Sequence, residues 1–152
     1  MSLNFLKNNP LFQECLEALN TCLLPKEESD KLSKLFKQIV PITTWGKVNW
    51  EKIDHHVFIG YDPIEIIPAL EKLLQQPVDK MVFIEWSDYE LPVIKANLDA
   101  IVKFFDDVAC VAHEKFIFNL TQGYIIEVRI GHAITVGLLP PMSKEQFEQA
   151  MA

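Results

Sequence analysis

The sequence predicts a single α+β domain over residues 1–152, built on a mixed β-sheet with helical crossovers, an N-terminal helical hairpin and a C-terminal antiparallel meander. Three observations support this fold class: the N-terminal part of the chain, up to Pro41, is helical in pattern, apolar runs at 57–59 and 81–86 are separated by a helical stretch, and short apolar runs follow closely after Lys115. Strands joined by a helix commonly pair in parallel and hairpin strands antiparallel, so the sheet is expected to be mixed.

The first half of the chain contains three predicted helices. Apolar residues recur at helical spacing over residues 11–22 and 32–39, and a proline follows each stretch. We expect Ser29 or Asp30 to cap the second helix, and the two helices to pack against each other as a hairpin. A third helix is expected over residues 63–74.

The second half begins with the run MVFIEW at 81–86, whose apolar residues on both faces predict a central strand. Residues 91–105 follow the i, i+3, i+4, i+7 rule and predict an amphipathic helix. The remaining elements are expected at 108–112 and 116–120 as one bent strand, at 124–129 and 133–138 as the closing strands of a meander, and at 143–151 as a final helix.

The charge of the chain narrows the classes of partner. Its net charge is −7, and ten of its 21 acidic residues lie in residues 81–152. An acidic face repels nucleic acid and anionic membranes and attracts basic proteins, so we expect neither a nucleic-acid nor a membrane partner. Ordinary solubility explains the same charge equally simply. The opening segment MSLNFLKNNP lacks a signal-peptide pattern, and no apolar run reaches the roughly 18 residues of a membrane span, which predicts a cytoplasmic protein.

Acidic residues flank the predicted helix over 91–105, and two explanations compete for them. Ser87, Asp88 and Glu90 precede it, where helix capping and the helix dipole account for their type and position. Asp106 and Asp107 follow it, where an acid opposes the dipole. A turn into the next strand explains this last pair, and so does a surface that faces a basic partner.

No pattern of catalytic or metal-binding residues stands out. Asp106 and Asp107 are adjacent and point in different directions, which disfavours a carboxylate dyad, and His55 and His56 face opposite sides of a strand. The three cysteines form no CxxC pair, and HExxH, GxSxG, P-loop and GxGxxG motifs do not occur. We therefore expect no enzyme, no catalytic residue, no metal site and no cofactor.

The larger aromatic residues offer a different kind of site. Trp45, Trp50, Trp86 and Tyr89 lie near the ends of predicted elements, and the last two stand beside acidic residues. Exposed Trp and Tyr side chains beside acids are typical of protein-binding patches, although core packing explains any one of them equally well.

The stretch from MVFIEWSDYELPVIKANLDAIVKFFDDVACVA through GYIIEVRIGHAITVGL resembles one group of bacterial immunity proteins of contact-dependent growth inhibition systems. In that group a strand ends in Trp followed by Ser or Asp, a helix opens with Leu-Pro, Asp-Asp-Val leads into a strand, and the closing hairpin carries Ile-Glu and Gly. The resemblance covers the C-terminal part of the chain from Met81 onward, and nothing before Met81 contributes to it. The matching residues are Trp86, Ser87, Leu91, Pro92, Asp106, Asp107, Val108, Ile126, Glu127 and Gly137.

The resemblance implies a cytosolic, non-catalytic protein that binds and neutralises the C-terminal toxin domain delivered by a neighbouring cell, often a nuclease. A toxin that acts on nucleic acid needs a basic surface, so an acidic inhibitor can be steered onto it. The hypothesis for the partner-binding residues is the set Trp86, Asp88, Tyr89, Glu90, Asp106, Asp107 and Glu114.

Two rival functions remain open at this point. One is a small enzyme or ligand-binding domain with an apolar pocket between sheet and helices, and the other is a structural protein that oligomerises through its N-terminal helices. An enzyme should have a cleft where two or more ionisable groups with perturbed pKa values converge, whereas an inhibitor should have a broad acidic face without such a cleft.

Overall fold

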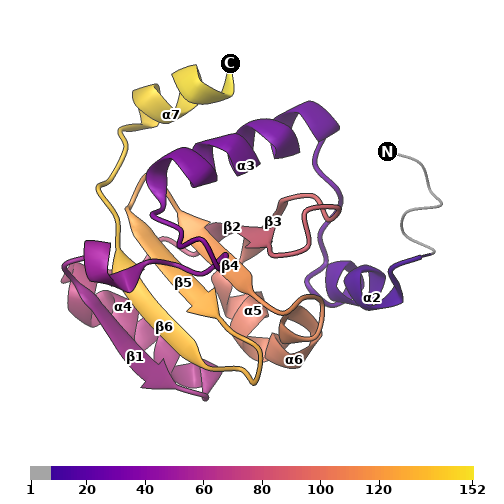
Figure 1. The fold of residues 1–152 in the computed structure, drawn as a ribbon, viewed down its shortest axis with the longest axis horizontal. Helices are drawn as coiled ribbons and strands as arrows, with labels where there is room; N and C mark the ends of the chain where they lie inside the picture. Colours follow the sequence, from indigo (N-terminus) through magenta and orange to yellow (C-terminus); the bar gives the residue numbers. More distant parts are fainter. Residues whose placement is uncertain (1–7) are drawn as a thin grey trace.

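The computed structural model describes residues 8–152. Residues 1–7 include most of the opening segment on which the prediction of no signal peptide depends, and they lie outside the described residues. The described chain forms a six-stranded antiparallel sheet with helices on both faces, which confirms the α+β fold class (Figure 1). No helix among the described residues is long and apolar enough to cross a membrane.

The elements follow one another in the order helix, helix, strand, helix, two strands, two short helices, three strands and a last helix. Short 3₁₀ turns at Trp50–Lys52 and Pro63–Glu65 precede β1 and α4. The bounds are α2 Pro10–Ala18, α3 Lys26–Ile39, β1 His56–Gly60, α4 Ile66–Leu74, β2 Met81–Trp86, β3 Ile94–Asn97, α5 Leu98–Lys103, α6 Phe105–Ala109, β4 Lys115–Asn119, β5 Tyr124–Val128, β6 Ile134–Leu138 and α7 Lys144–Met151.

The sheet has the strand order β1-β6-β5-β4-β2-β3, and every neighbouring pair is antiparallel. The prediction of a mixed sheet with parallel early strands is therefore wrong. The strands β1 and β2 run in the same direction, but the C-terminal meander β4-β5-β6 inserts between them. The helical crossover through α4 exists, but it connects β1 at one edge of the sheet to β2 near the opposite edge, and these two strands are not paired.

Two hydrophobic clusters pack on opposite faces of the sheet. The face that we call the α2 face carries α2, α4, α5 and α6, with buried residues such as Phe12, Leu70 and Ile101. The other, the α3 face, carries α3 and part of α7, with Leu32 and Phe36 buried against the sheet. Figure 1 shows α3 and α7 together on one side of the strands.

The predicted N-terminal helical hairpin is wrong, although both helices exist. Helix α2 packs on the α2 face and α3 on the opposite face. The linker between them passes the edge strand β3, where the Thr21 hydroxyl donates to the Lys95 carbonyl over 2.7 Å. Leu23 packs into one cluster and the neighbouring Leu24 into the other. The linker therefore wraps around the sheet edge and covers a strand that would otherwise expose its backbone.

The predicted helix over 91–105 is also wrong in its first half, because β3 forms there. Residues of β3 alternate between buried and exposed, and Ile84 and Val82 of β2 pair with Ile94 and Ala96. These residues form a strand despite their helical spacing because β2 is buried on both faces, and β3 provides hydrogen-bond partners for the backbone groups on one edge of β2. The helix begins only at Leu98, after Asn97 caps it.

Two smaller expectations also change. The predicted strand at 108–112 is the end of α6 and the loop after it. Ser29 does not cap α3, whose N-cap is Pro25; its buried hydroxyl instead accepts a hydrogen bond from the Val93 N–H at 2.9 Å. In contrast, β2 matches its predicted bounds, and the last helix starts after Ser143 with a full capping box.

Candidate functional site

The register of the sheet gathers several loops at one end of the strands. Trp86, Lys115, Val128, Ile134 and Gly60 lie in one row across β2, β4, β5, β6 and β1. The chain segments beyond this row emerge from the same end, which we call the loop end. These segments are residues 61–65, 87–93, 110–114 and 129–133. Most of the predicted partner-binding residues come from two of these segments.

Trp86 does not lie on the surface as the interface hypothesis requires. Its side chain is 2% exposed, packs edge-on against Phe12 and donates its indole N–H to the Pro92 carbonyl over 3.0 Å. The contact fixes the far end of the 87–93 loop to the strand from which the loop starts. Trp86 is thus a support for the loop, and its predicted role as an exposed anchor is corrected.

Asp88, Tyr89 and Glu90 form the exposed tip of the 87–93 loop, and Tyr89 is 87% exposed. The capping explanation is wrong because no helix starts here. Instead, the Asp88 carboxylate accepts the Glu90 N–H over 3.0 Å, which closes a local turn. The turn presents a tyrosine between two acids to solvent.

Asp106 and Asp107 lie in the first turn of α6, so they complement the helix dipole and do not oppose it. Asp106 is exposed and stands 3.9 Å from Nδ1 of His132, as an oxygen-to-nitrogen distance. Helix α6 packs on the α2 face through Phe105 and Val108. The structure therefore brings this pair to the opposite side of the sheet from Glu114 and the α3 face.

Two acidic side chains are buried without full hydrogen bonding near the loop end. Glu85 is 7% exposed and Glu114 is 8% exposed. The Oε2 atom of each is buried and has no hydrogen-bond partner among the described residues. Such unsatisfied buried carboxylate oxygens are costly and uncommon, which makes this pair the most unusual polar feature of the described chain.

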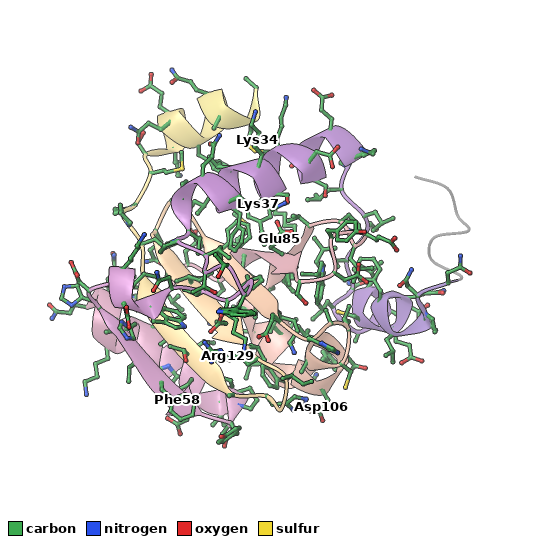
Figure 2. All side chains as sticks on the ribbon, viewed as in Figure 1. Lys34, Lys37, Phe58, Glu85, Asp106 and Arg129 are labelled. Carbon is green, nitrogen blue, oxygen red and sulfur yellow. The ribbon has the colours of Figure 1, made fainter. Side chains whose placement is uncertain are left out.

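Burial raises the pKa of the Glu85 carboxyl above its ordinary value, against the opposing effects of a hydrogen bond from Ser33 and the charge of Lys37. Figure 2 shows Glu85 and Lys37 near each other between α3 and the sheet. The raised pKa means that this environment disfavours the ionised acid more than water does, and a hydrogen-bond donor or a cation brought close to it would oppose that shift.

The pKa of Glu114 is also raised, first by burial and then by the nearby charge of Glu127. Lys47, Arg129 and Lys115 act in the opposite direction. Their charges do not overcome burial, so Glu114 shares the character of Glu85: an acid placed where its ionised form lacks adequate solvation.

A cleft of about 530 Å³ connects these two acids to solvent. It opens between α3, the loop over residues 41–49 and the ends of β2 and β4. We call it the acidic cleft after Glu85 and Glu114. Its lining also includes Lys37 and His113, and the aromatic residues Phe36, Phe116, Trp45 and Tyr89. The two aromatic residues at its rim, Trp45 and Tyr89, are each 87% exposed.

One wall of the acidic cleft, the 41–49 loop, is fastened to the sheet by Glu127. The Glu127 carboxylate accepts the Val48 N–H over 2.7 Å and the Trp50 indole N–H over 2.9 Å, and Arg129 Nε lies 3.0 Å from it. An Ile42–Val48 bridge closes the loop itself. Glu127 is therefore a structural acid whose partners hold the loop that carries Trp45.

Lys115 fastens the other wall. Its side chain is 1% exposed, and its ammonium group donates to the carbonyls of Ala109, Ala112 and His113 over 2.9–3.2 Å. Burial lowers the pKa of Lys115 from its ordinary value. The three carbonyls belong to the end of α6 and the loop after it, so Lys115 shapes the segment that places Glu114.

Sequence reasoning did not select Glu85 or Trp45 as site residues. A signal existed for Glu85, because it interrupts an otherwise apolar strand, and a charge in a strand buried on both faces requires a partner. Trp45 was noted among the aromatic residues near the ends of predicted elements, but no pattern in the sequence linked it to Glu85. Among residues 8–152, no group of three or more His, Cys, Asp or Glu residues is arranged to hold a metal ion.

An α+β sheet whose cleft combines exposed aromatic side chains with unsatisfied acceptors has the features of a protein-binding domain. A family model described as CdiI immunity protein, EcoliA0-like, matches residues 9–137, and the chain belongs to this family. The match begins far upstream of Met81, so the similarity extends well beyond the C-terminal region in which the sequence motifs were recognised. A search of curated proteins finds no match.

The family makes this chain an immunity protein of a contact-dependent growth inhibition system, which neutralises a toxin protein by binding it, and it implies a non-catalytic role. The presence of a cleft with two perturbed acids is the feature that sequence reasoning assigned to an enzyme. In a member of this family, the same cleft needs an explanation in terms of binding.

Proposed function

We propose that this chain binds and neutralises a cognate C-terminal toxin domain of the basic, nuclease type, in the cytoplasm and without catalysis, through acidic and aromatic residues at the loop end. The observation that carries the proposal is the exposed Asp88-Tyr89-Glu90 tip beside the acidic cleft. Tyrosine flanked by acids provides an anchor and an electrostatic guide for a basic surface.

The remaining predicted residues divide into two groups. Glu114 lies in the acidic cleft, and Trp86 supports the 87–93 loop from beneath. Asp106 and Asp107 approach the loop end from the α2 face, and we propose them as peripheral contributors that steer the toxin. The same proposal keeps residues 1–152 as one domain, with no metal or cofactor.

Titration calorimetry against the C-terminal toxin domain encoded beside this chain, at low and at moderate salt, tests the proposal. We expect a dissociation constant near the nanomolar range, about −12 kcal/mol, that weakens as salt screens the charges. Absence of binding at both salt concentrations would overturn the proposed function.

A rival function calls for one control because the acidic cleft satisfies the criterion for an enzyme. Two carboxyl groups facing one cleft also occur in hydrolases that use paired acids. No group of His, Cys, Asp or Glu residues that could hold a metal ion accompanies them in residues 8–152. If neutral variants of both acids abolish protection from the toxin while leaving toxin binding unchanged, the enzyme function gains support and simple inhibition loses it.

A further inference from the structure

We propose that the acidic cleft receives an arginine side chain of the toxin, held between Glu85 and Glu114 with Trp45 and Tyr89 at its rim. This inference rests on the proposed function and specifies its partner chemistry. It assigns to Glu85, which the sequence-based hypothesis omitted, a direct contact with the toxin.

The first argument is the unsatisfied acceptors. Glu85 and Glu114 each present a buried Oε2 atom without a donor among the described residues, and both line the acidic cleft. Glu127 shows that this fold can satisfy a buried carboxylate fully, because its two oxygens accept bonds from Val48, Trp50 and Arg129. The two open acceptors are therefore a property of this cleft and not of buried acids in the sheet generally, and they indicate a donor supplied from outside.

The second argument is the spacing of the two acids. Glu85 pairs with Phe116 in the β2–β4 ladder, and Ser87 continues the pairing by donating its N–H to the Glu114 carbonyl over 3.0 Å. Glu85 and Glu114 are thus diagonal neighbours on the α3 face. The Cα atoms of such neighbours are expected to lie about 7–8 Å apart. A planar guanidinium has donors on more than one edge and can bond to two carboxylates that extend from neighbouring positions of this kind.

The third argument is the shape and chemistry of the walls. Phe36 and Phe116 give the cleft an apolar lining, which suits the aliphatic stem of a long cationic side chain. Trp45 and Tyr89 are exposed at the rim, where their rings can stack on a guanidinium. Arginine fits these walls better than lysine, because its planar, weakly hydrated head both stacks and bridges carboxylates.

The charges that face the two acids are mixed. Lys37 on α3 lines the cleft and acts on Glu85. The charge of Glu127 raises the pKa of Glu114, while Lys47 of the 41–49 loop, Arg129 and Lys115 act in the opposite direction. Arg129 is already paired with Glu127, and Lys115 with the three carbonyls before β4. The cationic groups next to Glu114 are therefore engaged elsewhere in two of three cases, and burial still raises its pKa.

The test is a double-mutant cycle measured by titration calorimetry with the full chain and the toxin domain. The immunity variants are Glu85→Gln, Glu114→Gln and the double variant, and the toxin variants replace each surface arginine by alanine in turn. Glu145→Gln, an exposed acid on α7, is the matched control. Thermal unfolding of each free variant verifies that the fold is intact.

We expect the double Gln variant to weaken binding at least about 30-fold, the equivalent of about 2 kcal/mol for removing one side of a buried charge pair. One toxin arginine should lose its effect when combined with this variant, while Glu145→Gln binds as the unchanged chain does. Burial raises the pKa of both acids, and a bound guanidinium would lower it, so binding should release protons in the pH range between the bound and the free pKa values. In that range the heat should depend on the ionisation enthalpy of the buffer, and this dependence should disappear in the double variant.

The outcomes separate the two proposals. If the unchanged chain does not bind the toxin, the proposed function fails, and the arginine inference falls with it. If the unchanged chain binds tightly and the folded double variant binds equally tightly, the arginine inference is overturned while the immunity function stands. Weakened binding without coupling to any arginine also overturns it, because the acids would then act on another group.

Discussion

Two buried glutamates on the same face of the sheet, Glu85 and Glu127, differ in how well their carboxylate oxygens are hydrogen-bonded. Glu85, Phe116 and Glu127 lie side by side on β2, β4 and β5. Glu127 at one end is fully hydrogen-bonded within the protein, whereas Glu85 at the other end retains an unsatisfied oxygen, as does its diagonal neighbour Glu114. The difference teaches that burial alone does not define a functional acid; the partners do. Glu127 holds the structure, and the other two are left open for binding.

The largest expected effect on stability comes from removing the structural acid Glu127. Replacing Glu127 by alanine removes the acceptor for Val48 and Trp50 and leaves Arg129 without its partner. We expect a loss of about 3 kcal/mol of unfolding free energy, as for other buried charge pairs broken on one side. Urea denaturation followed by Trp fluorescence measures it. A loss no larger than that of an ordinary surface substitution, about 0.5 kcal/mol, would contradict the structural role of Glu127.

A second substitution, at Gly137, tests the hydrogen bond between Trp50 and Glu127 by crowding the Trp50 ring. A Cβ atom on Gly137 would lie 2.6 Å from the Trp50 ring and 3.2 Å from the His55 carbonyl oxygen. Gly137→Ala should therefore displace Trp50 from its bond with Glu127 and destabilise the protein by about 1–3 kcal/mol, the usual range for overpacking. An unchanged denaturation midpoint would show that Trp50 moves without cost and that its bond matters little.

Neutralising Glu114, whose Oε2 atom is unsatisfied, should raise the stability of the protein where removing Glu127 lowers it. Because the pKa of Glu114 is raised in the folded protein, folding is favoured when this acid is protonated, and stability from this group falls as pH rises from the unfolded pKa through the folded one. Glu114→Gln mimics the protonated acid, so it should raise the melting temperature at pH 7 by a few degrees, about 2–4 °C for each kcal/mol.

The same variant should give little or no gain at about pH 4, below the ordinary pKa of a glutamate, where the unchanged side chain is itself mostly protonated. Differential scanning calorimetry at both pH values measures the two gains. A gain of equal size at pH 4 and pH 7 would mean that the benefit does not come from the buried charge.

The smallest effect on stability is expected at the exposed acids. Asp88→Lys and Glu90→Lys change charges at the open tip of the 87–93 loop, where surface electrostatics contributes little to folding. They should slow toxin association several-fold at low salt, with less effect at high salt, since they act by steering. Stopped-flow kinetics measures the rate. An unchanged association rate would remove these two acids from the interface.

Much of the fold could be predicted from the sequence where one physical signal was dominant. The strand β2 follows from a run of apolar residues, and α3 follows from its apolar spacing. The strand β3 could not be separated from a helix, since Ile94, Leu98 and Ile101 satisfy helical spacing as well. The segment forms a strand because β2, which pairs with β4 on one edge, needs a second partner strand on the other.

The candidate site was predictable only in part. The tip residues Asp88, Tyr89 and Glu90 were selected and are exposed, whereas Trp86 was expected at the surface and is buried. Trp45 reaches the cleft from a loop far upstream of Glu85 in the chain, and that proximity depends on the attachment of its loop to Glu127. A contact between segments so distant in sequence leaves no local pattern for sequence reasoning to find.

Hydrogen–deuterium exchange of the chain with and without its toxin is the first measurement to make, because it locates the bound surface without any substitution. We expect new protection in residues 41–49, 87–93 and 110–114, which surround the acidic cleft. Exchange in α4, on the α2 face, should remain unchanged. Protection confined to α4, or to α7, with none around the cleft would contradict this expectation.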